Sequence, residues 1–265
     1  RALYAVVAED WQLAPDAVLG YSVGELAASV AAGCLATRDV AELFAATTYA
    51  NFDGGEAGDG VGAMAAVGGT DRAALDAAVA RAGDARLVVA ATYGRGNFMV
   101  AGPRGAVVDV ARDVEDRGGT AALLRGVRNA YHSPLHDVST DATRLKKHMP
   151  APSPPRVPLF SCAAGGAIAG TPPDVWWPPA LVDLGALYAA PVDFAGAMAA
   201  LDADVLLDLS LKGDLSYYAA AWRGPASKPA AIPTLRPSAD GPTALLAARA
   251  HLATLGRVAV VDRSS

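Results

Sequence analysis

The spacing of apolar residues near the start of the chain predicts a helix, a buried strand and a second helix in succession. The apolar positions of the first helix, over residues 1–13, are Leu3, Val6, Val7 and Trp11. Residues 17–19 form a short apolar run that breaks at Gly20, as a buried strand does at a turn. Residues 26–32 are small and apolar and stop at a glycine, which is typical of a helix end. This order indicates an α/β fold.

The pattern changes from Met64 onward, where short apolar runs alternate with helical spacing. We predict strands over residues 64–67, 87–91, 98–101 and 121–124, and helices over residues 72–81 and 106–116. The order βαββαβ is that of a ferredoxin-like subdomain. We therefore expect residues 61–126 to form such a subdomain, inserted into the α/β part of the chain.

The chain then returns to the larger body of the fold. Its predicted elements are a loop at 129–134, a helix at 138–149, a strand at 157–160, a helix beginning within 184–194, a strand at 205–209 and a helix at 243–255. We expect residues 1–60 and 127–235 to form one discontinuous body with a parallel sheet. Residues 236–265 are interpreted as a C-terminal linker segment.

Composition excludes several classes of function. The chain has 265 residues, a net charge of −5 and no basic tract, which argues against binding to nucleic acid or to an anionic membrane. It has no apolar run of about 20 residues and no signal peptide, so we expect a cytoplasmic protein. Cys34 and Cys162 lie in apolar or small-residue contexts, which predicts buried free thiols. We predict no metal site.

The motif Gly20-Tyr21-Ser22-Val23-Gly24 lies between the predicted strand and helix. Gly-x-Ser-x-Gly in this context is the nucleophile elbow of an α/β-hydrolase-like body, a turn expected to be too tight for side chains at Gly20 and Gly24. The serine hydroxyl would stand above the sheet, and the amide of Val23 would face a developing oxyanion at the helix N-terminus. The alternative is a loop that contains the pattern by chance.

A serine nucleophile needs a base, normally histidine. The chain has four histidines, and three of them are most simply surface or helix-start residues: His136, His148 and His251. His132 lies in the loop that returns from the inserted subdomain to the body. A loop between two subdomains is where catalytic groups gather, so His132 is the predicted base.

Residues 15–28 resemble the active-site stretch of acyl-carrier-protein transacylases, which carry a Gly-His-Ser-x-Gly-Glu motif. The chain is similar to the malonyl-CoA:ACP transacylase-like acyltransferase domains of modular, type I polyketide synthases and of fatty acid synthases. The His132-Ser133 pair, 110 residues (132 − 22) after Ser22, matches that family, as does an inserted ferredoxin-like subdomain. Further matches are Trp177, residues 191–194, residues 206–210 and residues 232–236.

The resemblance implies a Ser22–His132 dyad in which a main-chain carbonyl, expected near Ser161 or Cys162, orients the imidazole. Asp137 and Asp208 would then be structural. It implies ping-pong transfer of an acyl group from acyl-CoA to the phosphopantetheine thiol of an acyl carrier protein. No bound cofactor is expected, and the partners would be that carrier protein and neighbouring synthase domains.

Three departures from the family bear on this reading. Members that select a carboxylated extender unit carry an arginine 25 residues after the serine, where this chain has Thr47 (22 + 25). Tyr21 replaces the histidine before the nucleophile, and Asn129-Ala130-Tyr131-His132 matches neither usual specificity motif. We also expect the N-terminal part of the body, which supplies a second oxyanion donor in the family, to be missing from this chain. Loss of such a donor costs roughly 3–4 kcal/mol.

We therefore expect a transacylase for a non-carboxylated starter unit, with Tyr21, Thr47, Asn129 and Tyr131 contacting the substrate. An unpaired carboxylate in a closed pocket costs several kcal/mol, which would exclude malonyl and methylmalonyl groups. Three alternatives stay open. The chain could load extender units through Arg38, Arg125 or Arg128, hydrolyse acyl groups from carrier proteins, or serve as an inactive docking domain.

Overall fold

A computed structural model describes residues 2–42, 45, 62–127, 129–135, 153–163, 166–167, 190–201, 203–223 and 230–258. The chain divides into two compact units. One consists of residues 17–201, and the other joins residues 1–16 to residues 202–265. This division cuts the chain at other places than the boundaries expected from the sequence.

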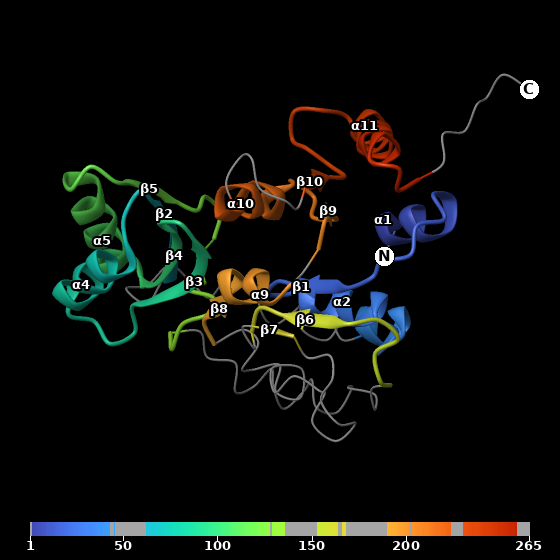
Figure 1. Cartoon of the computed structure of the whole chain (residues 1–265). Helices are drawn as coiled ribbons and strands as arrows, with labels where there is room; N and C mark the ends of the chain where they lie inside the picture. The colour runs from blue at the N-terminus through green and yellow to red at the C-terminus, as the bar shows by residue number, and fades with distance from the viewer. Residues whose placement is uncertain are drawn as a thin grey trace, which may run out of the picture. The chain divides into compact units, whose positions relative to one another are not determined.

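The unit of residues 17–201 contains a small sheet that carries the serine motif. Strand β1 (Val18–Gly20) pairs in parallel with β6 (Leu159–Ser161), which pairs antiparallel with β7 (Gly166–Ala167). Helix α2 (Gly24–Ala31) follows the turn after β1 and packs on this sheet, as Figure 1 shows. The parallel pairing places Gly20 opposite Ser161, so the serine turn lies beside the end of β6.

The second sheet of this unit confirms the predicted ferredoxin-like subdomain. Its four consecutive strands are β2 (Gly62–Gly68), β3 (Val88–Gly94), β4 (Asn97–Pro103) and β5 (Thr120–Leu123). They lie antiparallel in the order β5-β2-β4-β3. The strand β8 (Val192–Asp193) adds to the β3 edge in parallel, so a segment from outside the insertion completes the sheet.

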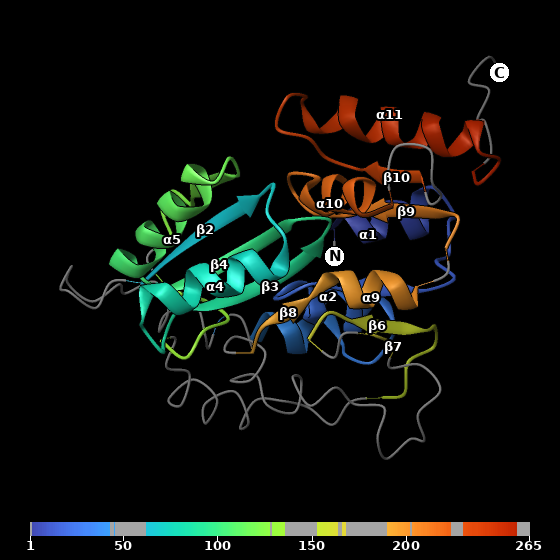
Figure 2. The ribbon, with the colours of Figure 1, turned by 60° about the vertical axis from the view of Figure 1, so that its left-hand side comes forward.

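Helices α4 (Arg72–Ala82) and α5 (Arg104–Asp116) cover one face of this sheet (Figures 1 and 2). Their buried faces meet alternate residues of the strands, as expected for an amphipathic helix on a sheet. The core of this layer is Ala63, Ala65, Val67, Leu75, Ala78, Leu87, Val89, Phe98, Val100, Val107, Val110 and Val114.

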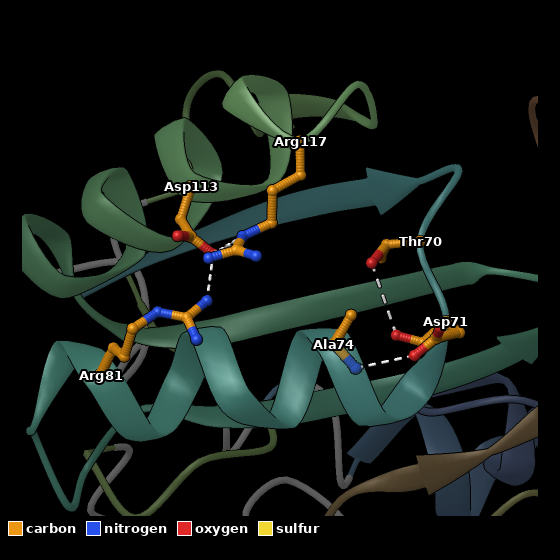
Figure 3. Close-up of polar contacts among 6 residues, drawn as sticks. All are labelled: Thr70, Asp71, Ala74, Arg81, Asp113 and Arg117. Atoms are coloured by element: carbon orange, nitrogen blue, oxygen red, sulfur yellow. Dashed lines mark hydrogen bonds and ion pairs between the residues drawn. The ribbon is translucent and has the colours of Figure 1, made fainter.

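Polar contacts fix the ends of these two helices, as Figure 3 shows. The carboxylate of Asp71 accepts a hydrogen bond from the amide of Ala74 and caps the N-terminus of α4. Asp113 on α5 binds both Arg117 and Arg81, the second of which comes from α4. The hydrogen bonds from Arg117 and Arg81 lower the pKa of Asp113. Such exposed pairs fix orientation more than they add stability.

A helix was expected to begin within residues 184–194, and helix α9 does begin there, at the last residue of that range. The chain is extended at β8, and helix α9 begins only at Phe194 and runs to Ala200. The carboxylate of Asp193 accepts a hydrogen bond from the amide of Gly196 and caps α9. The pairing of β8 with β3 is a long-range contact that no local pattern announces.

The other unit contains a parallel pair of strands, β9 (Val205–Asp208) and β10 (Ala230–Pro233). Figure 2 shows two helices against this pair, α10 (Asp214–Arg223) and α11 (Gly241–Thr254). The N-terminal segment, α1 (Ala2–Ala5) with the π-helical turn η1 (Val6–Asp10), shares their core. The sequence did not predict α10 or β10. Helix α11 confirms the helix predicted at 243–255, although that stretch was interpreted as part of a linker segment.

Glycine at position 20 is required by the close approach of α2, and glycine at position 24 is not. A Cβ atom on Gly20 would lie 2.5 Å from the Cα of Glu25, whereas one on Gly24 would meet nothing within 4 Å. The expectation that the turn excludes side chains at both positions is therefore wrong for Gly24. The elbow is tight on its strand side alone.

We predict that Gly20→Ala lowers the free energy of unfolding by about 2 kcal/mol or more, because α2 must move away from β1. Gly24→Ala is the matched control and should leave stability unchanged or slightly raised, since alanine favours helix over glycine. Urea denaturation of both variants measures the difference. Equal destabilisation by the two substitutions would contradict this account of the turn.

Candidate active site

Ser22 lies at the apex of a sharp turn between β1 and α2. Its backbone φ is +51°, a left-handed conformation that costs a residue other than glycine roughly 1–3 kcal/mol. The turn is closed by two backbone hydrogen bonds, from the amide of Gly24 to the carbonyl of Tyr21 and from the amide of Glu25 to the carbonyl of Ser22. This strained strand–turn–helix geometry is that of a nucleophile elbow.

The structure places His132 beside the serine hydroxyl. The Oγ atom of Ser22 is 2.8 Å from the Nε2 atom of His132, although 110 residues separate the two. The imidazole is 4% exposed, so bulk water hardly reaches it. His132 also has a left-handed backbone, with φ at +61°. Both residues of the pair are thus held in conformations that the surrounding structure must enforce.

A main-chain carbonyl fixes the tautomer of this histidine. The Nδ1 atom of His132 is 2.9 Å from the carbonyl oxygen of Ala190, and a carbonyl can only accept a hydrogen bond. Nδ1 must therefore carry a proton and donate it. In the neutral ring, Nε2 is then an acceptor, so the hydroxyl of Ser22 donates its hydrogen bond to it. The arrangement can remove a proton from the serine without a carboxylate.

The carbonyl was expected near Ser161 or Cys162, and the structure corrects this to Ala190. The carbonyl oxygen of Cys162 accepts a hydrogen bond of 2.8 Å from the amide of Asp193 instead. That bond draws the segment before α9 toward the end of β6. The position facing His132 is consequently taken by a residue three places before Asp193.

The loop that carries His132 is fixed by its own hydrogen bonds and by a close contact. The hydroxyl of Ser133 donates to the carbonyl of Ala130 at 2.7 Å and accepts from the amide of Leu135. A Cβ atom on Gly62 would lie 2.4 Å from the amide nitrogen of Ala130, so the start of β2 touches the loop backbone. The first strand of the inserted subdomain therefore supports the histidine loop.

Glu25, three residues after the serine, has a buried carboxyl group. One oxygen, Oε1, accepts hydrogen bonds from the hydroxyl of Ser161 at 2.7 Å and from the amide of Ala163 at 3.0 Å. The other oxygen, Oε2, is buried and has no hydrogen-bond partner among the described residues. Burial raises the pKa of Glu25 to about 7, although the hydrogen bonds from Ala163 and Ser161 act in the opposite direction.

The remaining predicted site residues divide into those that the structure describes near the dyad and one that it does not describe. Val23 is the N-cap of α2, with its side chain partly exposed. The side-chain Nδ2 of Asn129 donates a hydrogen bond to the hydroxyl of Tyr131 at 3.2 Å, just before His132. Tyr21 contacts Tyr93 and Phe194, which the sequence analysis did not single out. Thr47 lies outside the described residues.

The other chemical groups add no second centre in the described part of the chain. Cys34 and Cys162 are buried free thiols, as predicted, and burial raises the pKa of Cys34 to about 11. No three histidine, cysteine or acidic side chains of the described ranges come together as metal ligands would. Of the helices that the structure describes, none combines the length and the apolar character needed to cross a membrane.

The raised pKa of Glu25 predicts a pH-dependent stability. Between pH 4.5 and 7 the unfolded chain loses this proton while the folded chain keeps it, so the free energy of unfolding falls as pH rises. Glu25→Gln cannot ionise, and from pH 5 to pH 8 it should lose roughly 2–3 kcal/mol less than the unsubstituted chain. Urea denaturation at both pH values checks this, with the exposed Glu115→Gln as control. An identical pH slope for Glu25→Gln and the unsubstituted chain would disprove it.

Comparisons with known proteins agree with this geometry. Residues 2–170 match the acyl transferase domain family. The chain is 37% identical over 160 residues to the spectinabilin polyketide synthase system protein NorB of Streptomyces orinoci, which covers 58% of this chain and 7% of that protein. It is 33% identical over 152 residues to 6-methylsalicylic acid synthase of Aspergillus terreus, covering 57% of this chain and 8% of the synthase. The chain thus spans a small part of the curated relatives it matches.

Solved structures give the same result. The acyltransferase domain from the second module of the salinomycin polyketide synthase is 27% identical with a TM-score of 0.75, and the match covers 96% of this chain and 57% of that one. A loading acyltransferase from the avermectin modular polyketide synthase is 25% identical with a TM-score of 0.75, covering 94% of this chain and 76% of that one. The family explains three features together: the α/β body with its serine elbow, the histidine on the returning loop and the inserted ferredoxin-like sheet. The chain belongs to the acyl transferase domain family.

Proposed function

We propose that this domain transfers an acyl group from acyl-CoA to the phosphopantetheine thiol of an acyl carrier protein through an acyl-Ser22 intermediate. The observation that carries the proposal is the chain of contacts from the Ser22 hydroxyl through His132 to the carbonyl of Ala190. It provides a nucleophile with a base whose tautomer is fixed. Family membership and the polyketide synthases among the relatives support a carrier protein as the acceptor and further synthase domains as neighbours.

In the first half of the reaction, Nε2 of His132 takes the hydroxyl proton of Ser22 while the serine oxygen attacks the thioester carbonyl carbon. The tetrahedral intermediate then breaks its carbon–sulfur bond, and the leaving thiolate of coenzyme A takes the proton from His132 and departs as the thiol. In the second half the carrier thiol gives its proton to Nε2 and attacks the acyl-Ser22 ester. The serine oxygen leaves and recovers the proton, so the enzyme ends unchanged.

The amide of Val23 is the proposed oxyanion donor. It lies at the N-terminus of α2, where the helix dipole favours negative charge. The next amides, of Gly24 and Glu25, are engaged in closing the turn. A donor directly after the nucleophile is the arrangement of other serine elbows.

The proposed acyl group is a non-carboxylated starter unit, because Thr47 replaces the arginine that would bind a carboxylate. The exposure of two of the arginines that could substitute for it argues against a role in binding a buried carboxylate. The side chain of Arg38 is 82% exposed and pairs with Glu42, and Arg125 is exposed. Arg128 lies outside the described residues.

Three described residues are proposed to contact the acyl group. Tyr21 flanks the nucleophile, and the hydrogen-bonded pair of Asn129 and Tyr131 comes immediately before the base. The bulky ring of Tyr131 would favour a small acyl group without a branch at C2. Thr47 completes the proposed set from the sequence alone.

We predict that incubation with equimolar acetyl-, propionyl-, butyryl-, malonyl- and methylmalonyl-CoA gives a simple acyl adduct on the protein and none that carries a carboxylate. Intact-mass spectrometry measures the adduct, and Ser22→Ala should abolish it because the hydroxyl is the attacking group. A malonyl or methylmalonyl adduct would instead make the domain an extender-loading acyltransferase.

We further predict that acyl-Ser22 discharges faster to a phosphopantetheinylated carrier protein than to water. The closed turn and the buried base limit access of water, whereas a thiol bound at the site is held beside Nε2. Mass spectrometry of both proteins after mixing gives the two rates, with a carrier lacking phosphopantetheine as control. Faster release to water would make the domain an acyl hydrolase, and absence of any adduct would favour a docking role.

A further inference from the structure

Three aromatic side chains meet beside the serine turn, each from a different element. Tyr21 directly precedes Ser22, Tyr93 belongs to β3, and Phe194 is the first residue of α9. The ring centroids of Tyr21 and Phe194 are 6.2 Å apart in an edge-on arrangement, and those of Tyr93 lie 5.8 Å from Tyr21 and 6.2 Å from Phe194. These distances are those of favourable aromatic pairs.

The two tyrosine hydroxyls of this cluster are hydrogen-bonded to each other, one donating and the other accepting. Tyr93 is 3% exposed, so its hydroxyl requires a partner inside the protein. Tyr21 supplies a partner 72 residues away in sequence. The hydroxyl pair thus joins the serine turn to the inserted sheet.

Phe194 extends this connection to the histidine side of the dyad. The segment from Ala190 to Phe194 contacts His132 at one end, through the Ala190 carbonyl, and the aromatic cluster at the other. Between them, β8 pairs with β3 in the register that places Asp193 opposite Thr92. Tyr93 and Phe194 therefore follow a fixed backbone pairing by one residue each.

We propose that Tyr93 is a positioning residue, which holds the Ser22 turn and the segment that orients His132 in one relative placement through its hydroxyl bond to Tyr21 and its ring contact with Phe194. This inference rests on the proposed function, since the affected quantity is the rate at which Ser22 is acylated. Through Tyr93, the inserted sheet would then affect the rate of the reaction, although neither Ser22 nor His132 belongs to that sheet. The tyrosine that replaces the family's histidine at position 21 would thus have two roles, one in contacting the acyl group and one in binding Tyr93.

The physical effect of losing the hydroxyl pair is small in stability and larger in rate. Tyr93→Phe keeps all three rings and removes the neutral hydrogen bond to Tyr21, and the net contribution of such a bond to stability is modest. The turn and the orienting segment would then sample other relative placements. Because proton transfer from Ser22 to His132 requires a short, aligned contact, a small misplacement slows it strongly.

The test is a double-mutant cycle with Tyr21→Phe, Tyr93→Phe and the combined variant. The rate constant for acyl-Ser22 formation is measured in a single turnover with the acyl-CoA that the unsubstituted domain accepts. We expect each single variant to be slowed about tenfold, and the acyl-CoA concentration that gives half the maximal single-turnover rate to be unchanged in Tyr93→Phe. The combined variant should be no slower than either single one, because both remove the same bond. The exposed Tyr217→Phe is the matched control and should retain the full rate.

A fluorophosphonate probe, which reacts with the activated serine without any acyl-CoA, separates this inference from the proposed function. It also titrates the folded sites, so that every rate is expressed per reactive serine. If the unsubstituted domain reacts with the probe but with no acyl-CoA, the proposed function fails, and the cycle is decided by the probe rates.

Two results would overturn the positioning role. If Tyr93→Phe reacts at the full rate per folded site and only its midpoint of thermal unfolding drops, Tyr93 is merely structural. If the two single effects add in the combined variant, the hydroxyls act separately and the pair does not couple the turn to the orienting segment.

Discussion

The hydrogen bond from Nδ1 of His132 to the carbonyl of Ala190 is the interaction on which the site depends. It fixes the ring orientation and leaves Nε2 as the acceptor for the serine proton. A carbonyl is neutral, so it stabilises the imidazolium less than a carboxylate would. That suits thioester chemistry, because a thiol leaves far more easily than an amine and needs less help from a strong acid. A dyad completed by the main chain is thus sufficient for the proposed reaction.

A five-residue segment next to this bond, residues 190–194, contacts both the inserted sheet and the serine turn. Its first residue, Ala190, orients the base, its middle residues form β8 at the edge of the inserted sheet, and Phe194 packs against Tyr21. The insertion is therefore tied to the site through backbone pairing rather than through a flexible tether. On the other side of the turn, Glu25 fastens α2 to the end of β6 through a carboxyl group whose burial opposes its ionisation. The buried carboxyl group is thus an unfavourable feature that lies next to the serine turn and helps to fix it.

Local patterns in the sequence were sufficient for most of the elements. The strand–glycine–serine–glycine–helix order at residues 17–33 predicted β1, the turn and α2, and the alternation of apolar runs predicted the inserted subdomain and its fold. The same reasoning selected His132 from four histidines, and the structure brings it to Ser22. These successes share a cause, since each depends on spacing within one element or on a loop between two recognised units.

At the site, the features that escaped prediction depend on contacts distant in sequence. A main-chain carbonyl has no residue type, so nothing marks Ala190 as the partner of His132, and β8 is too short to show a period of its own. Tyr21 was recognisable as a departure from the family. Its partner Tyr93 lies, by the sequence prediction, in the connection between two strands, where no pattern distinguishes it. The left-handed backbones of Ser22 and His132 could not be predicted either, because the local preference of both residues disfavours that conformation. The motif locates in the sequence a site where local preference is overruled at Ser22 and at His132. The forces that overrule it act between segments, so identifying them requires the folded chain.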